Sequence, residues 1–276
     1  MNLAKFTFHK MGENRTNFFT FINNLVADDY AHKIIVSSTA FAGSLLVLHK
    51  FIQFPYGKTY IKRRFKFQKE VNDRLSFIIV HGSAPFVFYL IFKSLSKPFI
   101  SFPTFFYMLY YFHLVVVYPW FRSIKSRPWP LRSIIYYTIR SMISGYNASI
   151  IFISKKKEMN LIFKLMLFVA LLNVSIVTSI HDYILCYLRQ PGEMGYRIPM
   201  SLLFNVTSSP NYLFELLMWS LFSLYFKPSL DVFAFWFLHA SNLITRALDV
   251  HEAYRKLFSS KYPPNRAFLL PKTISF

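Results

Sequence analysis

The chain alternates between long apolar runs and short polar connections that are mainly basic. A run of about 18 or more mainly apolar residues can cross a bilayer core of about 30 Å. The runs lack an alternating period of two, which favours helices over a barrel, because a helix satisfies its own backbone hydrogen bonds in lipid. We expect seven spans, which are roughly Ile34 to Phe54, Leu75 to Phe92, Pro103 to Phe121, Ser133 to Ile153, Leu161 to Leu185, Tyr212 to Phe226 and Leu230 to Ile244.

This pattern predicts an all-α integral membrane protein with about seven transmembrane helices in one bundle. The last two runs are short and are expected to form a helical hairpin around Lys227 and Pro228. No internal repeat or low-complexity segment divides the chain, so we expect one membrane domain over residues 1–276. Residues 1–30 form an N-terminal tail that does not look like a cleavable signal, so the first span is expected to insert the protein.

The distribution of charge predicts an orientation in the membrane. The chain has 32 Lys and Arg against 12 Asp and Glu, but these charges lie between apolar segments rather than on one soluble face. Basic loops flanking spans explain them better than nucleic-acid binding does. With seven spans, most of the basic connections fall on one side, which predicts a lumenal N-terminus and a cytosolic C-terminus. Lys155, Lys156 and Lys157 fall on the other side, against this orientation.

Composition argues against several kinds of site. Glycine is scarce, with 7 residues, so a glycine-rich nucleotide loop is not expected. The single Cys186 excludes an internal disulfide and is interpreted as a small packing residue. Histidines and acidic residues are too dispersed for metal-ligand spacing, so no metal is predicted. His239 and Asn242, three residues apart in the last span, are expected to make hydrogen bonds between helices.

Polar residues beside spans are densest between His181 and Glu215. Such groups are costly near a bilayer and are therefore candidate functional residues. Arg189 and Arg197 carry forked donors that can pair with phosphate oxygens. Asn211 can bond an amide, and Glu215 lies four residues later on the same helical face. Judged by residue types alone, an amphipathic loop with arginines at the lipid headgroups is the better explanation.

The same region closely resembles the steroid 5α-reductase family over residues 178–276. The matching residues are His181-Asp182-Tyr183-Ile184-Leu185, Leu188-Arg189, Pro191-Gly192-Glu193, Gly195-Tyr196-Arg197-Ile198-Pro199, Leu203-Phe204, Ser208-Ser209-Pro210-Asn211-Tyr212, Glu215, Trp219, Arg246-Ala247, His251, Tyr254, Tyr262-Pro263, Arg266 and Pro271. A weaker match covers Tyr110-Tyr111-Phe112-His113, Tyr118-Pro119 and Arg127-Pro128-Trp129-Pro130.

The resemblance implies a seven-span bundle that binds NADPH between its cytosolic loops and spans. It also implies reduction of a carbon–carbon double bond conjugated to a carbonyl. Carried over by position, the residues of the cofactor pocket are Asp182, Arg189, Tyr196, Arg197, Asn211, Glu215, His251 and Tyr254. Tyr111 matches the tyrosine that hydrogen-bonds the substrate carbonyl. In a dry site its O–H would stabilise the negative charge that builds on the carbonyl oxygen; the alternative is a purely structural buried hydroxyl.

The chain departs from the family pattern at several positions. His81 stands where steroid-reducing members carry a glutamate that shares the carbonyl with the tyrosine. A protonated imidazole can also donate a hydrogen bond, although a histidine in a span can equally cap a backbone carbonyl. Ser201 and Leu202 replace the paired glycines that follow Ile-Pro, and Thr178 replaces a common asparagine. Each of these losses is expected to reshape the cofactor site.

The leading hypothesis is therefore a monomeric NADPH-dependent reductase of the endoplasmic-reticulum membrane. Its lipid substrate is expected to be a 3-oxo-4-ene steroid, with a trans-2-enoyl-CoA or a polyprenal as alternatives. The missing glutamate argues mildly against a standard steroid site. A membrane methyltransferase, which would need S-adenosylmethionine, is an alternative enzyme class, and a non-enzymatic membrane scaffold is the remaining alternative.

Overall fold

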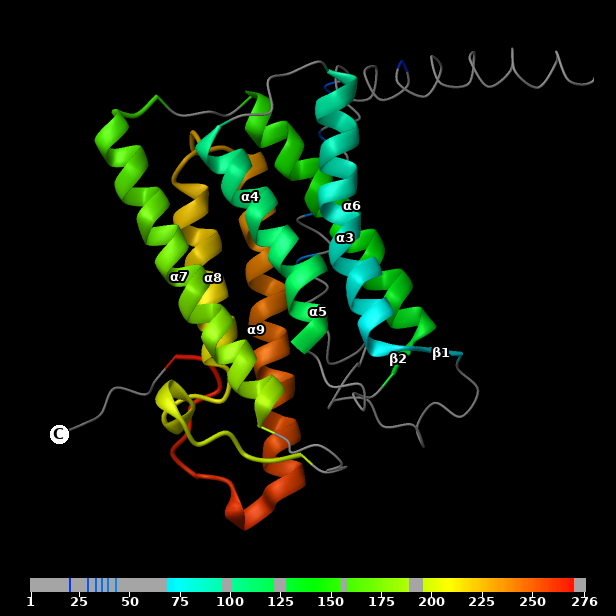
Figure 1. Ribbon diagram of the computed structural model, residues 1–276, viewed down its shortest axis with the longest axis vertical. Helices are drawn as coiled ribbons and strands as arrows, with labels where there is room; N and C mark the ends of the chain where they lie inside the picture. The colour runs from blue at the N-terminus through cyan, green and yellow to red at the C-terminus, as the bar shows by residue number, and fades with distance from the viewer. Residues whose placement is uncertain are drawn as a thin grey trace, which may run out of the picture.

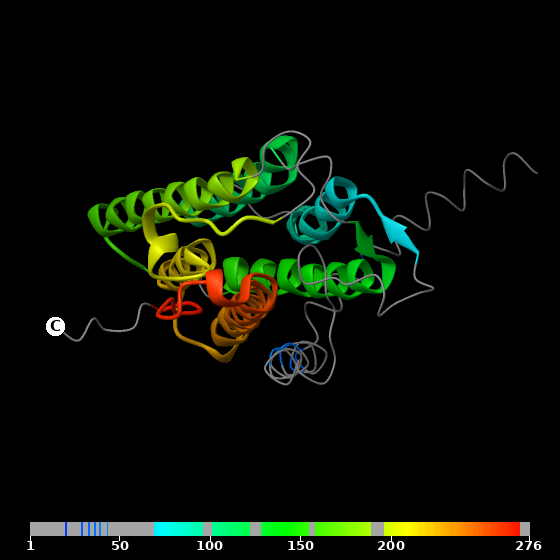
Figure 2. The ribbon, with the colours of Figure 1, turned by 90° about the horizontal axis from the view of Figure 1, so that it is seen from below.

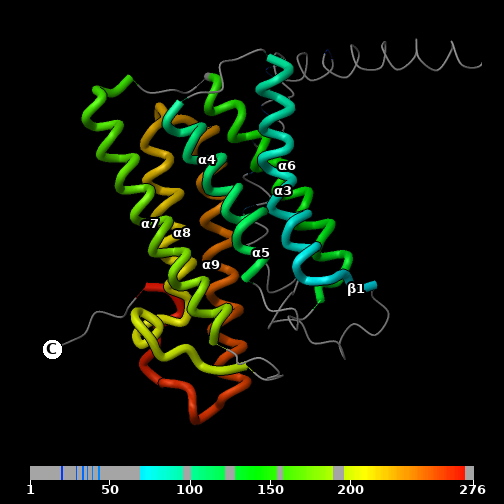
Figure 3. The backbone as a smooth tube through the Cα atoms, in the orientation of Figure 1, coloured from blue at the N-terminus to red at the C-terminus, as the bar shows by residue number. Residues whose placement is uncertain are grey.

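The structure is a computed structural model of the 276-residue chain. It describes residues 69–95, 101–121, 128–154, 158–188 and 196–270, together with Thr20, Asp29, Lys33, Val36, Thr39 and Gly43. The described part is a bundle of long helices (Figure 1) in which successive helices run in alternating directions (Figure 3). The predicted helical fold is confirmed for these residues. The count of seven spans stays a prediction, since most of Ile34 to Phe54 lies outside them.

Helices α3 (Asp73–Ser94) and α6 (Leu131–Ser154) pack against each other on one side of the bundle. Asn72 caps α3 by accepting hydrogen bonds from the backbone N–H groups of Arg74 at 2.9 Å and Leu75 at 3.4 Å, which satisfies donors that the first turn leaves open. Gly145 on α6 faces Ala84 on α3 so closely that a Cβ would overlap the Ala84 carbonyl oxygen. This contact fixes the spacing of the two helices.

A second rod consists of α4 (Phe102–Phe112), the π-helical turn η3 (His113–Val117) and α5 (Tyr118–Phe121). Its N-terminus is capped by Ser101, whose hydroxyl accepts from the N–H of Thr104 at 3.4 Å. Pro103 lies in the first turn, where a missing N–H costs no helical hydrogen bond. The π-helical turn begins two residues after Tyr111, and such turns are frequent at functional sites.

The other side of the bundle is formed by α7 (Leu161–Tyr187), α8 (Pro210–Ser223) and α9 (Leu230–Phe258). Helix α8 contacts both α7 and α9, and α6 contacts α9. The predicted hairpin is present, because residues 224–229, including Lys227 and Pro228, connect α8 to α9. Helix α9 continues to Phe258, beyond the predicted end of the last span at Ile244. Its last turns are polar in sequence, but they bury Val250 and Tyr254. The helix therefore extends beyond the end of the apolar run.

Three of the described helices are long and apolar enough to cross a membrane: Asp73–Ser94, Phe102–Phe121 and Leu161–Tyr187. Only 17% of the most apolar stretch of Leu161–Tyr187 is buried in the protein. An exposed apolar surface of that extent suits contact with lipid. These features identify a membrane protein.

A short antiparallel strand pair, not expected from the sequence, joins the beginnings of α3 and α6. Glu70 of β1 (Glu70–Val71) lies opposite Pro130 of β2 (Trp129–Pro130). The indole N–H of Trp129 donates to the carboxylate of Asp73 at 2.7 Å. Both side chains are buried, so this hydrogen bond holds the two helix starts together.

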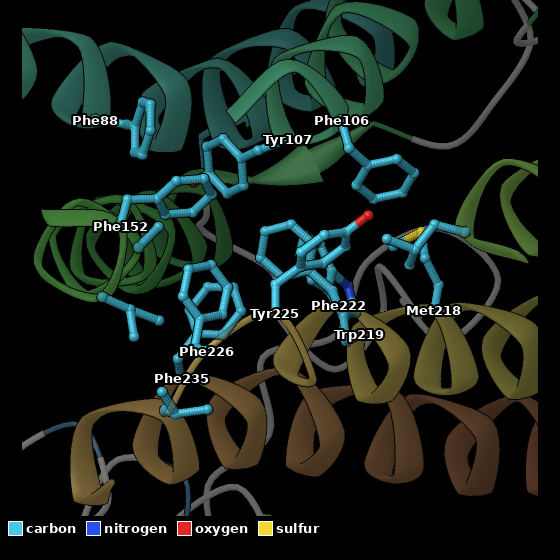
Figure 4. Packing of buried hydrophobic residues seen from close by; sticks show 14 of the residues in the cluster. Phe88, Phe106, Tyr107, Phe152, Met218, Trp219, Phe222, Tyr225, Phe226 and Phe235 are labelled. Carbon is cyan, nitrogen blue, oxygen red and sulfur yellow. The ribbon is translucent and has the colours of Figure 1, made fainter. Parts of the chain in front are cut away.

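Aromatic rings fill the interior between the helices, as Figure 4 shows. The largest fully buried side chains include Trp219, Tyr107, Phe88, Phe106, Phe152, Phe222 and Phe235. Neighbouring rings adopt the edge-to-face geometry that aromatic pairs favour; Trp219 and Phe222, for example, are perpendicular with centroids 5.5 Å apart. Polar side chains in this aromatic interior are costly unless they form hydrogen bonds with other protein groups or with a bound molecule.

Residues 196–209 and 259–270 form a layer of mainly irregular chain across one end of the bundle, below α8 and α9 in Figure 1 and facing the viewer in Figure 2. We call these two segments the end layer. Thr207 bridges Ala267, the N–H of Ser208 donates to the Ala267 carbonyl at 2.9 Å, and the N–H of Ala267 donates to the Val206 carbonyl at 3.0 Å. These bonds join two segments that are far apart in sequence.

Candidate functional site

Tyr111 lies in the bundle interior and is 5% exposed. Its ring lies 4.8 Å from that of Tyr107 and 5.3 Å from that of Tyr110, between centroids. The polar groups that interact with its hydroxyl include Tyr107, Ser144 and the guanidinium of Arg140. The phenol predicted to bind a substrate carbonyl is therefore in a dry interior among further hydrogen-bonding groups.

His239 connects helix α9 to this tyrosine. One imidazole nitrogen, Nε2, lies 2.9 Å from the Ser144 hydroxyl of α6, so the predicted hydrogen bonding of His239 between helices is confirmed. The ring also stacks on Trp219, with centroids 4.2 Å apart. Ser144 thus faces both Tyr111 and His239.

His81 of α3 is half-buried and packs on Phe77 with ring centroids 4.1 Å apart. It interacts electrostatically with His239, which in turn bonds Ser144. The two predicted catalytic residues, Tyr111 and His81, therefore belong to one group of side chains. We call this group, Tyr111, His81, Arg140, Ser144 and His239, the central polar cluster.

Arg140 was not among the candidate residues. One of its terminal nitrogens, Nη2, donates to the Leu238 carbonyl at 2.8 Å. Its Nε–H is buried and has no hydrogen-bond partner. The signal that would have found it is a charge in the middle of the predicted span Ser133 to Ile153, because a charged side chain at membrane depth is costly.

Glu215 links the central polar cluster to the predicted cofactor residues. Its carboxylate accepts a hydrogen bond from the Tyr110 hydroxyl at 2.7 Å and a longer one from the Trp219 indole at 3.5 Å. Tyr110 is the chain neighbour of Tyr111. Glu215 was predicted to line the cofactor pocket, so the structure places one predicted cofactor residue directly beside the predicted catalytic tyrosine.

Asp182 and Asn211, predicted to line the same pocket, bond each other at 2.8 Å, the amide of Asn211 donating to the carboxylate. The neighbouring residues in sequence carry buried polar atoms without hydrogen-bond partners, the Nε2 of His181 and the Oγ of Ser209. The other imidazole nitrogen, Nδ1, lies 2.7 Å from the Val177 carbonyl and donates to it. Buried polar atoms that lack hydrogen-bond partners can form hydrogen bonds with a bound polar molecule.

His251 and Tyr254, the remaining predicted cofactor residues of α9, lie at the end layer. Nδ1 of His251 is 2.6 Å from the Ser208 hydroxyl, which also bonds the Tyr262 hydroxyl and the Ala267 carbonyl. The ring of Tyr254 stacks on that of Tyr262, 14° from parallel. Burial raises the pKa of the Tyr262 hydroxyl above its usual value, so it stays protonated at neutral pH and can donate. Sequence reasoning quoted Ser208 and Tyr262 but gave them no role.

Tyr196 and Arg197 lie in the end layer, where Tyr196 is half-buried and Arg197 is exposed. An exposed guanidinium can donate to a phosphate that binds from outside the bundle. Arg189 lies outside the described residues.

Leu202 and Thr178 are two of the positions at which the chain departs from the family pattern. Leu202 has a φ of 50°, the left-handed conformation that favours glycine, so the backbone of this turn keeps the form expected for the missing glycine. Thr178 is buried, and its hydroxyl donates to the Val174 carbonyl of its own helix at 2.9 Å. Among the described residues there is no group of three or more His, Cys, Asp or Glu that could hold a metal.

Comparison with known proteins gives matches that agree with one another. The model of the 3-oxo-5-alpha-steroid 4-dehydrogenase family matches residues 128–274. The chain is 35% identical over 171 residues to human 3-oxo-5-alpha-steroid 4-dehydrogenase 2, which covers 59% of this chain and 64% of the relative. It is 43% identical over 103 residues to rat 3-oxo-5-alpha-steroid 4-dehydrogenase 1, covering 37% of this chain and 39% of the relative.

A relative with a different name also matches. The very-long-chain enoyl-CoA reductase of Dictyostelium discoideum is 36% identical over 105 residues, which covers 36% of this chain and 34% of the relative. The chain thus spans less than two thirds of the length of each of these three relatives. The family match begins at residue 128, so it includes the end layer but neither His81 nor Tyr111.

Proposed function

Because the chain belongs to the 3-oxo-5-alpha-steroid 4-dehydrogenase family, we propose that it is an NADPH-dependent reductase of a lipid. The bond reduced is a carbon–carbon double bond conjugated to a carbonyl, with a 3-oxo-4-ene steroid as the leading substrate. The observation that carries this proposal is the position of Tyr111. Its phenol is buried in the interior beside Ser144 and Arg140, and its neighbour Tyr110 bonds Glu215 of the proposed cofactor site.

The residues proposed to hold NADPH form two groups in the described structure. Asp182, Asn211 and Glu215 are on α7 and α8 close to the interior, where amide and carboxylate groups suit a polar ring. His251, Tyr254, Tyr196 and Arg197 are at the end layer, and Arg197 offers a donor fork for phosphate. His181 and Ser209 each have a buried polar atom without a hydrogen-bond partner, which supports the binding of a polar molecule beside the first group.

The protein residues have two tasks in the proposed reaction. The reducing equivalents come from the cofactor when it is bound. Tyr111 donates its O–H to the substrate carbonyl, and this hydrogen bond strengthens as negative charge moves onto the oxygen. The aromatic interior excludes water, which increases the effect of that donor. In total, two electrons and two hydrogens add across the double bond.

An enoyl-CoA is the second candidate substrate. The relative from Dictyostelium discoideum bears the name of an enoyl-CoA reductase, and His81 stands where steroid-reducing members are expected to carry a glutamate. A thioester carbonyl conjugated to a double bond develops the same negative charge on oxygen, so Tyr111 would act on it in the same way. A polyprenal is the third candidate on the same chemical grounds.

The test is product analysis by mass spectrometry. Membranes that contain the full chain are incubated with NADPH and, separately, a 3-oxo-4-ene steroid, a trans-2-enoyl-CoA or a polyprenal, with Tyr111→Phe as the matched variant. We expect a gain of two hydrogens on one substrate and loss of that product in the variant. Membranes that neither bind NADPH nor reduce any substrate would refute the proposal and favour the scaffold hypothesis. Methyl transfer from S-adenosylmethionine would instead support the methyltransferase alternative.

We also propose that the protein is a monomer in the endoplasmic-reticulum membrane, with a lumenal N-terminus and a cytosolic C-terminus. The end layer would then face the cytosol, where NADPH is available. Protease protection of terminal tags in intact microsomes tests this: the C-terminal tag should be digested and the N-terminal tag protected. The opposite pattern would overturn the orientation.

A further inference from the structure

Arg140 is a partly buried cation on α6 whose charge acts on a carboxylate, that of Glu215, without a direct ion pair. Among the described residues, no Asp or Glu forms an ion pair with it. The carboxylate of Glu215 takes its hydrogen bonds from Tyr110 and Trp219 instead. A cation at membrane depth without a directly paired anion is costly, which makes Arg140 a candidate functional residue.

The guanidinium is held in place by the backbone rather than by an acid. Nη2 donates to the Leu238 carbonyl of α9 at 2.8 Å, while the buried Nε–H has no hydrogen-bond partner. This arrangement fixes the plane of the group and leaves a donor for another molecule. A backbone carbonyl, unlike a paired carboxylate, does not neutralise the positive charge.

The charge of Arg140 acts on the groups that surround the proposed reaction centre. It interacts with the hydroxyl of Tyr111 on α4, the carboxylate of Glu215 on α8 and the imidazole of His239 on α9. Groups on three other helices therefore lie within electrostatic range of this one side chain. The only other charged or titratable member of the central polar cluster is His81, which interacts with His239.

We propose that Arg140 is a second catalytic residue of this site, supplying a fixed positive charge to the substrate oxygen that Tyr111 hydrogen-bonds. The inference rests on the proposed function and deepens it. When electrons move from the double bond toward the carbonyl, the oxygen becomes an enolate, and a fixed cation stabilises that anion more than the neutral ketone or thioester. The oxygen loses this charge when the α-carbon is protonated, so Arg140 gains and loses no atom.

This assignment makes the site selective for substrates whose oxygen becomes anionic during the reaction. It predicts that a substrate analogue with a carboxylate in place of the carbonyl binds more tightly than the neutral saturated product. An isolated packing role for Arg140 predicts no such preference, because packing does not distinguish the charge of the ligand.

The experiment compares Arg140→Met, which removes the charge, with Arg140→Lys, which keeps it, in the detergent-purified full chain. Arg255→Met, at an exposed position of α9, is the control for loss of one positive charge elsewhere. We expect Arg140→Met to lower kcat roughly 100-fold, as for loss of an oxyanion donor, with the KM for substrate and the affinity for NADPH changed less than about threefold, as for loss of a contact made only in the transition state. Arg140→Lys should recover about tenfold of that loss, since it keeps the charge but not the fork.

Ligand-binding affinities distinguish a catalytic role of Arg140 from a purely structural one. The affinity for the carboxylate analogue should fall about 100-fold in Arg140→Met, while the affinity for the neutral product should stay within about threefold. A parallel loss for both ligands, or wild-type kcat in Arg140→Met, would overturn the assignment. If Arg140→Met fails to bind NADPH, the test uses Arg140→Lys, which keeps the charge. Arg140→Lys should bind the carboxylate analogue more tightly than the neutral product. Equal affinities for the two ligands would overturn the assignment.

Failure of the proposed function is separately visible. A wild-type protein that reduces no enone, enal or enoyl thioester overturns the reductase proposal and this inference with it. A wild-type protein that turns over normally, alongside an equally active Arg140→Met, overturns only the role of Arg140.

Discussion

The central polar cluster and the end layer are built in different ways. The five residues of the cluster come from four helices, α3, α4, α6 and α9, and only Arg140 and Ser144 share a helix. The end layer consists of two continuous segments whose polar residues follow one another in sequence, with Ser208 bonding His251 and Tyr262. The family match includes the end layer and leaves His81 and Tyr111 outside.

The two regions also differ in how they depart from the family pattern. In the end layer the glycine is lost, yet Leu202 keeps a φ of 50°, so the backbone form is retained although the side chain changed. In the cluster the expected difference is one of chemistry, since His81 stands where the family resemblance implies a glutamate. If the proposed function holds, the end layer keeps the backbone form of a cofactor site while the cluster differs in side-chain chemistry.

The largest expected effect is at Tyr111. Replacing it with Phe removes one hydroxyl from the buried cluster and should lower kcat about 100- to 1,000-fold, because a donor to the developing oxyanion is lost. NADPH affinity, measured by fluorescence titration, should stay unchanged. Wild-type kcat in this variant would remove the catalytic assignment. Tyr107→Phe, which leaves Tyr111 in place, is the matched control for loss of a neighbouring buried hydroxyl.

Gly145→Ala should damage the cluster without touching a polar group. The added Cβ would overlap the Ala84 carbonyl oxygen, so α3 and α6 must separate, at a cost of about 1 to 3 kcal/mol of stability. The two helices carry His81 and Arg140, so kcat should fall as well. Thermal unfolding in detergent measures the stability change, and Gly82→Ala, where a Cβ meets nothing nearer than 3.8 Å, is the control. Equal stability of the two variants would contradict the close packing.

Arg197→Ala tests the end layer. Loss of an exposed donor fork should weaken NADPH binding about tenfold, because a charge-assisted hydrogen bond to phosphate is removed. The kcat at saturating NADPH should change little, which is the opposite of the Tyr111→Phe result. Lys261→Ala, exposed in the same layer, serves as the control, and an unchanged NADPH affinity for Arg197→Ala would remove the cofactor assignment.

The smallest expected effect is a gain in stability. Leu202→Gly places the residue that tolerates a positive φ in the turn, and should stabilise the protein by about 0.5 to 1 kcal/mol, since relief of the left-handed strain outweighs the greater chain entropy of glycine. Leu202 is 60% exposed, so little packing is lost. The unfolding temperature should rise while kcat and NADPH affinity stay constant; Leu203→Gly, with ordinary backbone angles, should lower it. A decrease for Leu202→Gly would show that the conformation is not strained.

The sequence by itself determined the helices and the family. Apolar runs predicted the helices from α3 to α8 with ends within three residues of those observed, because hydropathy and helix length are local properties of the chain. The family was identified from residues that stand together in short motifs, such as Ser208-Ser209-Pro210-Asn211-Tyr212 and the stretch from His181 to Leu185. Such motifs are local too.

Only the tertiary structure decided which isolated polar residues meet. Arg140 and Tyr111 are separated by 29 positions, and Ser144 and His239 by 95; the spacing along the chain carries no sign that these residues lie near one another. The extension of α9 past Ile244 was decided in the same way, because burial of Val250 and Tyr254 against the end layer stabilises turns that are polar in sequence. Contacts between distant segments depend on how whole helices pack, and no local pattern encodes that packing.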